Sequence, residues 1–395
     1  MQRFMMVFLV ALGIVRPQSG VETAPPAVTV TLRNPIDVPR SSETIVLLAA
    51  ELRRLLSVDD IRRVHVRDAR SGQDLLTQAV DTNDDGVFEE FIFQADFAPK
   101  ELRKFVLSVG ERQVLHPEDF KAYGRFVQER RDDFAWENDR IAHRMYGAAL
   151  ETWPQEPLTS SAVDVWTKRV SRLVINNWYL VDDYHRDHGE GGDFYSASTT
   201  RGCGGNGIWA GGRLYPSTNF HGSRSLANGP IRVMFELTYP AWDAAGVPMS
   251  EVKRITLDAG QNFNHFESHY RVEKGTRELA SAIGIRKGPH PATSASPEQG
   301  SLRAWETLPG DAGQLGQAVI LDPANLLSFT EDKDNFLVTT KIPADGVVGY
   351  YAGFGWSKNG FRAVEDWDRC VAQYAARLRS PIEVTIPAGP RQKPE

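Results

Sequence analysis

The chain has 395 residues, of which 41% are hydrophobic, 24% charged and 10% aromatic, an ordinary composition for a globular protein. Its 45 basic and 51 acidic residues give a formal net charge of −6. This balance excludes a general nucleic-acid binder, because such proteins need a basic surface. The length predicts two domains, or one large β domain with an appendage.

The first residues have the pattern of an export signal. A short basic start, Met1–Arg3, precedes an apolar run over Phe4–Val15 that suits a signal but is too short to span a membrane. We therefore predict a signal peptide over residues 1–24 and a periplasmic or secreted protein. No later segment reaches membrane-spanning length, so we expect no membrane partner once the signal is removed.

Short alternating runs of apolar and polar residues follow the signal. Four of them are Val28–Leu32, Arg62–Asp68, Glu90–Asp96 and Lys104–Val109. Alternation between closely spaced turn residues is typical of short strands. The sequence predicts a small β-sandwich domain over residues 25–120, a usual size for such a module.

The remainder, residues 121–390, carries longer alternating runs. The predicted strands are Ile231–Tyr239, Glu251–Asp258, Phe263–Arg271, Phe336–Thr340 and Val347–Phe354. Helical periodicity is confined to Ala49–Leu56 and Trp367–Leu378. Pro289–Gly300 has the composition of a surface loop, and Arg379–Glu395 has that of a frayed tail. We predict a mainly β protein whose second domain is a large antiparallel β-sandwich, with a polar sheet face that holds a ligand.

The segment from Asp81 to Gly86 resembles the start of a calcium loop. Asp81, Asn83 and Asp85 offer oxygen ligands at alternate positions, and Gly86 permits a sharp turn. The twelfth position is Ile92, so the glutamate of an EF-hand is missing, although Glu89 or Glu90 could replace it. A structural calcium and a metal-free acidic turn are equally compatible with this pattern. We expect no other cofactor, and none that takes part in a reaction.

A loop rich in histidine, glycine and carboxylates, from Asp182 to Gly207, is the most informative feature. It carries His185, His188, Glu190, Asp193 and Tyr195 among many glycines. Clustered titratable groups on an irregular backbone are typical of a catalytic or binding site. A solvated surface loop is the alternative. A metal site is a weaker alternative, because the histidines lie three residues apart and on no evident helix.

Two further segments are candidates for the site. The block from Arg125 to Arg144, which includes His143, mixes charged and aromatic residues and fits either a site or an ion-paired linker between domains. Trp356 to Gly360 fits a loop that closes over a cleft. Cys203 and Cys370 could pair in an oxidising compartment, but nothing in the sequence brings them together.

Four motifs carry a family resemblance: Arg130–Asp139, Asp187–Tyr195, Arg201–Gly205 and Lys253–Asp258. Over roughly residues 30 to 380 the chain resembles a family of secreted bacterial proteins catalogued as a domain of unknown function and found among polysaccharide-degradation genes. The resemblance implies a galactose-mutarotase-like β-sandwich. It also implies dehydration of the terminal uronate of ulvan oligosaccharides, the activity of one branch, and it assigns no catalytic residues.

Elimination from a uronate needs a group that neutralises the carboxylate, a base and an acid. For an acidic oligosaccharide we assign the first role to Arg201 with Lys253 or Arg254, the second to His188 or His185, and the third to Tyr195. Glu190 would hold a histidine tautomer. The remaining predicted substrate-binding residues are Asp193, Glu236, Glu267, His143 and Trp356.

Three other functions remain open from the sequence. A glycoside hydrolase would need two carboxylates across the scissile bond, and Glu236 with Glu267 would serve if their strands adjoin, with Asp193 as a further candidate. A mutarotase or epimerase is compatible with the fold that the resemblance implies. A non-catalytic periplasmic carbohydrate-binding protein would use the same sheet face without turnover.

Overall fold

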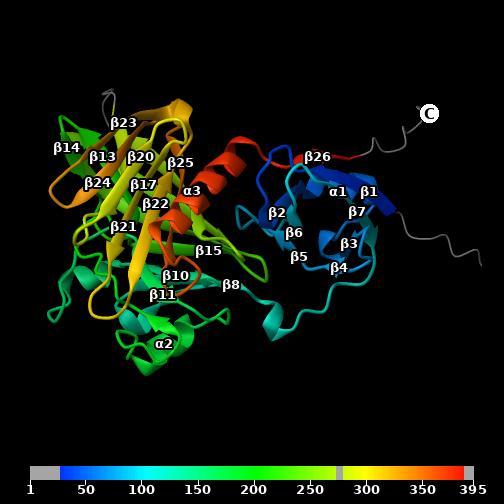
Figure 1. The fold of residues 1–395 in the computed structure, drawn as a ribbon, viewed down its shortest axis with the longest axis horizontal. Helices are drawn as coiled ribbons and strands as arrows, with labels where there is room; N and C mark the ends of the chain where they lie inside the picture. Colours follow the sequence, from blue (N-terminus) through cyan, green and yellow to red (C-terminus); the bar gives the residue numbers. More distant parts are fainter. Residues whose placement is uncertain (1–26, 273–278, 387–395) are drawn as a thin grey trace, which may run out of the picture.

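The computed structural model describes residues 27–272 and 279–386. The predicted signal peptide over residues 1–24 lies outside the described residues. Figure 1 shows a small β domain, blue to cyan, beside a larger β domain, green to orange, with a red helix that leads from the large domain back to the small one. The predicted mainly β architecture is confirmed.

The small domain is built from two antiparallel sheets packed face to face. Their strands are β1 Ala27–Arg33, β2 Arg40–Leu48, β3 Val64–Asp68, β4 Asp74–Leu75, β5 Thr77–Val80, β6 Glu90–Phe97, β7 Leu102–Val109 and β26 Glu383–Thr385. One sheet has the order β26-β1-β7-β3-β4 and the other β2-β6-β5. The chain therefore returns to the small domain at its end, because β26 pairs with β1.

Alternation places one face of each small-domain strand in a common core. Val30 and Leu32 of β1 are fully buried, as are Phe93 of β6 and Phe105 of β7, whose rings lie 5.3 Å apart. Helix α1, Ala49–Leu56, begins directly after β2 and buries its apolar stripe in the same core. The predicted helix over these eight residues is confirmed.

The large domain contains three antiparallel sheets. The first has the order β12-β11-β10-β9-β8, the second β14-β13-β19-β24-β23, and the third, with eight strands, β15-β16-β17-β18-β25-β22-β21-β20. Their bounds are β8 Ala122–Val127, β9 Asp133–Asn138, β10 Ile141–Met145, β11 Asp164–Lys168, β12 Gly191–Gly192, β13 Cys203–Ala210, β14 Arg213–Tyr215, β15 Gly222–Asn228, β16 Arg232–Ala244, β17 Val247–Asp258, β18 Phe263–Val272, β19 Ala280–Arg286, β20 Ala292–Ser296, β21 Ser301–Thr307, β22 Gln314–Ile320, β23 Leu326–Glu331, β24 Asn335–Lys341 and β25 Val347–Trp356.

All three sheets contribute to one core. Phe134 of β9, Ile283 of β19 and Phe266 of β18 belong to the same buried cluster, so the two five-stranded sheets form a layer opposite the eight-stranded one. A parallel bridge between Val163 and Gly202 joins the two five-stranded sheets. A Cβ on Gly202 would lie 2.1 Å from the Val163 carbonyl oxygen, so the glycine is needed for this crossing.

Two helices cover the large domain. Helix α2, Ile175–Val181, packs Trp178 and Tyr179 onto Trp166 of β11. Helix α3, Val364–Arg379, lies on β21 and β22 and buries Trp367 completely before the chain reaches β26. Five short 3-10 helices also occur in the described part of the chain: Ile61–Arg63, Pro117–Asp119, Gln128–Arg130, Ala148–Thr152 and Pro323–Asn325.

The structure corrects several predictions about individual segments. Pro289–Gly300 contains strand β20 and is not wholly a loop, and the predicted tail contains β26 before residues 387–395, which are not described. Helix α2 was not predicted. Within the described residues, no helix has the length and apolar character that a membrane crossing requires.

Candidate active site

A cavity of about 1040 Å³ opens in the large domain beside the histidine- and glycine-rich loop. The loop supplies one wall through residues 185–198, and the ends of β10 and β11 supply another. The segments 156–158 and 309–312 and Lys358 complete the lining. The lining side chains that could bind substrate or transfer a proton include Arg144, Tyr146, Asp164, His185, Arg186, Asp193, Tyr195 and Lys358.

Arg144 is the centre of the buried wall. Its Nε donates to Asp164 Oδ2 at 2.8 Å, its Nη2 donates to Asp193 Oδ2 at 2.9 Å, and its Nη1 lies 3.6 Å from Asp133 Oδ2. The Tyr146 hydroxyl donates to the same Asp164 oxygen at 2.9 Å. One guanidinium therefore compensates three buried carboxyl groups, so the cluster has more acids than cations.

This excess of acids shifts the pKa values of the cluster. Burial, reinforced by the charge of Asp164, raises the pKa of Asp193 well above its usual value. Burial also raises the pKa of Asp133 to about 7, against the opposing effect of Arg144. Burial disfavours the charged form of Arg144, but Asp193 and Asp164 outweigh it and raise the pKa of this guanidinium. Burial thus favours the protonated forms of Asp133 and Asp193.

His185 lies at the rim of the cavity, where 69% of its side chain is exposed. Its Nδ1 lies 3.2 Å from the Asp193 carbonyl oxygen and 3.6 Å from Asp193 Oδ2. Because both neighbours are acceptors, Nδ1 carries the proton in the neutral ring and Nε2 keeps its lone pair. Asp193 therefore orients His185 as a base, the role that the sequence assigned to Glu190.

His188 does not share this cavity. Its Nε2 lies 2.7 Å from Asp183 Oδ2, and both side chains are about half exposed. It lines a separate hollow of about 160 Å³ together with Glu190 and Trp178. Of the two predicted bases, only His185 lies at the main cavity.

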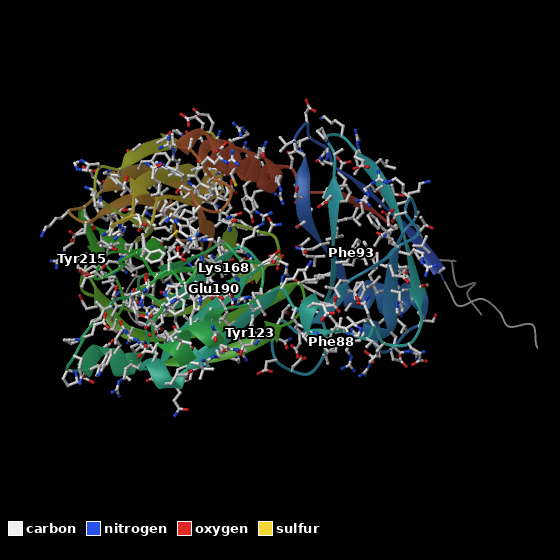
Figure 2. The ribbon with its side chains drawn as sticks, turned by 60° about the horizontal axis from the view of Figure 1, so that its bottom comes forward. Phe88, Phe93, Tyr123, Lys168, Glu190 and Tyr215 are labelled. Atoms are coloured by element: carbon white, nitrogen blue, oxygen red, sulfur yellow. The ribbon has the colours of Figure 1, made fainter. Side chains whose placement is uncertain are left out.

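Glu190 contacts neither histidine by a hydrogen bond or ion pair. Its carboxylate accepts from Trp178 Nε1 at 2.8 Å and pairs with Arg172. Figure 2 shows Glu190 beside Lys168 in the body of the large domain, where Gly191 pairs with Lys168 across β11 and β12. The prediction that Glu190 holds a histidine tautomer is wrong, because this carboxylate anchors helix α2 instead.

Tyr195 lines the cavity although it is buried. Its hydroxyl donates to Gln317 Oε1 at 2.6 Å, and Gln317 donates in turn to Glu306 at 2.8 Å. Arg286 lies over the Tyr195 ring at 4.0 Å and pairs with both oxygens of Glu306. Burial raises the pKa of Tyr195 well above its usual value, so the phenol is protonated, and Gln317 accepts its one hydroxyl hydrogen.

Two cations of the lining make no ion pair within the described structure. Arg186 and Lys358 make no ion pair with any described residue. The acids Glu156 and Asp187, by contrast, are paired with Arg130 and Arg169, respectively, outside the lining. Asp311 is the one lining acid without an ion-pair partner in the described part of the chain. An anionic ligand is therefore compatible with this cavity.

The predicted carboxylate neutralisers lie elsewhere. Arg201 is 2% exposed and donates to Ser161 Oγ at 2.9 Å, and burial lowers its pKa to about 10. Lys253 is fully buried between the sheets, 3.7 Å from Glu251, and burial lowers its pKa. Neither side chain lines a cavity that we identify in the described structure, so their predicted role in substrate binding is wrong.

Arg254, Glu236 and Glu267 lie on the outer face of the eight-stranded sheet, away from the main cavity. Glu236 of β16 and Glu267 of β18 are both in register with Arg254 of β17, so the two glutamates are separated by a strand. Arg254 donates to Glu236 at 2.7 Å. The condition for a hydrolytic pair, that their strands adjoin, is not met.

His143 and Trp356 are core residues. His143 is fully buried, with Nδ1 2.9 Å from the Asp164 carbonyl oxygen and Nε2 3.0 Å from the Asn264 amide nitrogen, and burial lowers its pKa to about 4. Trp356 donates to the Ala312 carbonyl at 2.7 Å and is 2% exposed. Neither can contact substrate directly, although Lys358, from the same predicted loop as Trp356, does line the cavity.

The acidic loop of the small domain brings Asp81, Asp85 and Glu89 together, with one oxygen of each within 4.8 Å of the others. Asn83, the other predicted ligand, accepts from the Asp85 backbone at 2.9 Å through its side-chain oxygen. Of Glu89 and Glu90, the two candidates for the missing EF-hand glutamate, Glu89 lies in this group. The structural calcium itself stays a prediction.

Sequence reasoning missed Arg144, Tyr146 and Asp164. Arg144 was inside the charged block that was interpreted as a site or a linker, but Tyr146 and Asp164 belong to no motif. They are polar residues on strands β10 and β11 or just beyond, where nearly every position is buried. A charged residue within a run of buried positions was the only available signal, and burial cannot be read from one sequence. The two cysteines are free, and Cys203 is a core residue of β13.

The chain belongs to the family described as "Domain of unknown function (DUF4861)", which it matches over residues 32–384. It is 32% identical over 374 residues to "Uncharacterized protein P7" of Formosa agariphila, covering 90% of this chain and 93% of that protein. This match confirms the predicted resemblance to a family of unknown function.

Two solved structures from Enterococcus faecalis are similar to this chain to different degrees. One is a protein in the glycosyl hydrolase family 38, with a TM-score of 0.54 and 10% identity, covering 93% of this chain and 48% of that one. The other is an alpha-mannosidase with a TM-score of 0.46 and 11% identity, covering 93% and 47%. The chain spans about half the length of these proteins, and the first likeness shows a shared β fold.

Proposed function

We propose that this protein is an exported enzyme of polysaccharide degradation that eliminates water, or a glycosidic leaving group, from the terminal uronate of an acidic oligosaccharide. The observation that carries the proposal is the position of His185, whose Nδ1 is held by Asp193 while the ring lines a cavity of about 1040 Å³. The β fold shared with a glycosyl hydrolase family 38 protein supports a sugar as the substrate.

The unpaired cations of the lining would bind the substrate's carboxylate. Arg186 and Lys358 line the same cavity and make no ion pair with described residues. A cation at the carboxylate makes the neighbouring C–H more acidic, because it stabilises the negative charge that develops as the proton leaves. Arg186 and Lys358 thus take the role first assigned to Arg201, Lys253 and Arg254.

The proposed reaction uses side chains only. His185 Nε2 takes the proton from the carbon beside the carboxylate, and the electron pair of that C–H bond forms a carbon–carbon double bond. The bond from the next carbon to its oxygen breaks, and Tyr195 donates its hydroxyl proton to the departing oxygen. Arg286, over the Tyr195 ring at 4.0 Å, stabilises the phenolate. A proton then passes from the His185 imidazolium through water to Tyr195, so that both side chains return to their starting forms.

Changing His185→Gln is expected to reduce turnover about 100- to 10,000-fold, because glutamine can keep the hydrogen bond to Asp193 but cannot accept the proton. The assay is incubation with a panel of uronic-acid oligosaccharides, followed by mass spectrometry for products that have lost one water. His188→Gln is the matched control and should retain nearly full activity, because His188 lies outside the main cavity. Full activity of His185→Gln, or no water loss with any substrate of the panel, would contradict the proposal.

Arg186→Ala and Lys358→Ala are each expected to raise KM for a uronate substrate about tenfold or more, since each removes a charged contact to the carboxylate. The effect should shrink as salt is added, because these side chains are partly exposed. Arg213→Ala, on exposed strand β14, is the control and should leave KM unchanged. Unchanged KM in both cavity variants would show that the carboxylate binds elsewhere.

A second candidate function is glycoside hydrolysis in the same cavity. Asp164 and Asp193 both lie on Arg144, and burial raises the pKa of Asp193, as a general acid requires. Hydrolysis would appear in the same assay as products that have gained one water. Mutarotation or epimerisation would leave the mass unchanged, and a carbohydrate-binding protein would retain the oligosaccharide without any product.

A further inference from the structure

We propose that a second cavity, between the two domains, is a binding site for an uncharged sugar unit. This cavity has a volume of about 540 Å³ and lies on the outer face of the eight-stranded sheet. It shares no lining residue with the cavity of His185. The inference does not depend on the reaction proposed above.

Both domains build the second cavity, so it is a fixed feature of their arrangement. Glu43 and Glu90 of the small domain face strands β16, β17, β18 and β25 of the large domain and helix α3. Arg232 of β16 donates to Glu90 at 2.9 Å, and Arg377 of α3 donates to Glu43 at 3.0 Å. These two ion pairs join the domains across the walls of the cavity.

The arginines of this cavity carry no spare charge. Arg232 makes two hydrogen bonds to Asp258, at 2.7 and 2.9 Å, in addition to its pair with Glu90. Arg254 is held by Glu236 at 2.7 Å and Arg377 by Glu43. Glu236 is shared with Arg224 and Glu43 with Arg40, so these five arginines are balanced only when Glu267 is counted together with Glu43, Glu90, Glu236 and Asp258. An anionic ligand gains little here.

Glu267 is a lining carboxylate that no arginine contacts directly in the described structure. Within the described structure it makes no hydrogen bond or ion pair, and it shares one face of β18 with His265. Burial lowers the pKa of His265, so this imidazole is neutral at physiological pH. The Tyr351 ring stacks on His265 at 4.6 Å, and its hydroxyl has no partner among the described residues.

These groups match the chemistry of a neutral sugar. A free carboxylate, an imidazole and a phenol offer several acceptors and donors for hydroxyl groups, and the stacked Tyr351 and His265 rings offer an apolar face for the C–H groups of a pyranose. Because arginines and carboxylates balance around this cavity, a cationic or an anionic ligand would add a charge that no group on its walls compensates. A polyhydroxylated, uncharged ligand adds no charge to the cavity and can still form hydrogen bonds with its walls.

The test uses the full-length protein and named probes: the neutral disaccharides cellobiose, lactose, maltose and mannobiose, with glucosamine and glucuronate as charged comparisons. Binding is measured by calorimetry and by ligand-observed NMR. We expect at least one disaccharide to bind, and Glu267→Gln and Tyr351→Ala each to weaken it about tenfold. Glu365→Gln, an exposed carboxylate of α3, and His185→Gln should leave the affinity unchanged.

The proposal is overturned if no disaccharide of the panel binds, or if binding survives both Glu267→Gln and Tyr351→Ala. It is also overturned if glucosamine or glucuronate is the ligand whose binding Glu267→Gln and Tyr351→Ala weaken, while the neutral disaccharides are unaffected. Loss of binding in His185→Gln would place the sugar in the first cavity instead. Because Glu267→Gln preserves the shape of the side chain, its effect separates lost binding from misfolding, which circular dichroism of each variant checks independently.

Discussion

Replacing Arg144 with methionine is expected to destabilise the protein by at least about 3–5 kcal/mol, the cost of leaving buried charge without its partner. Three buried carboxyl groups, Asp133, Asp164 and Asp193, face this one guanidinium. The loss is a large share of the roughly 5–15 kcal/mol that separates folded from unfolded proteins. Denaturant unfolding measures it. Arg67→Met, which breaks an exposed pair with Asp74, is the control and should cost less than about 1 kcal/mol.

The same variant should depend on pH in a defined direction. The pKa of Asp133 is already raised to about 7, and removing Arg144 raises it further because a cation that lowers it is lost. A carboxyl group whose pKa is higher in the folded than in the unfolded state stabilises at low pH, and this contribution is lost as the pH rises through the folded pKa. The destabilisation of Arg144→Met should therefore be smaller at about pH 5 than at about pH 8. An equal loss at both values would contradict this account.

Lys168→Met is expected to cost about 3–5 kcal/mol for the same physical reason. The Lys168 ammonium is fully buried and donates to Glu137 at 2.6 Å and to the carbonyl oxygens of Asn138 and Arg172, both at 2.8 Å. Glu137 also accepts from the backbone of Val174 and Ile175, where helix α2 begins. Without Lys168 the Glu137 carboxylate is buried and uncompensated, so thermal and denaturant unfolding should both show the loss.

A second substitution separates the charge effect from lost packing. Lys168→Met combined with Glu137→Gln removes both charges and keeps the amide oxygen that can accept from the backbone at the start of α2, so it should recover part of the stability. Lys341→Met, an exposed lysine at the end of β24, is the control and should be close to neutral. If the double variant is less stable than the single one, the ion pair is not the cause.

The strands of both sandwiches could be predicted because half-buried strands alternate. The run Glu90–Asp96 falls within β6 and Phe263–Arg271 within β18, where buried and partly exposed positions follow each other. Helix α1 could be predicted because its apolar residues recur at helical spacing. Helix α2 could not be predicted, since it has only seven residues and an exposed Leu180. Its stability comes from Glu137 and Trp166, which are distant in the sequence.

The site could be predicted only in part. Clustered titratable residues on a loop can be recognised in the sequence, but single polar residues on buried strands cannot. The run that contains His185, Asp193 and Tyr195 was found by its composition, and these three residues do line one cavity. Arg144 and Asp164 complete the cluster from strands in which nearly every residue is buried, so no periodicity distinguishes them. Lys253 and Arg254 are neighbours in the sequence and were predicted to act together. Successive residues of a strand point to opposite faces of the sheet, so the two side chains lie apart.

The pairing of β26 with β1 has a consequence for biosynthesis. Because Glu383–Thr385 completes a sheet that Ala27–Arg33 begins, the large domain is an insertion between two strands of the small one. During translation β1 is made long before β26, its partner strand. The edge of β1 that pairs with β26 stays unpaired while the large domain, more than two hundred residues, is synthesised. The first domain to be synthesised can therefore complete its sheet only after the large domain has been made.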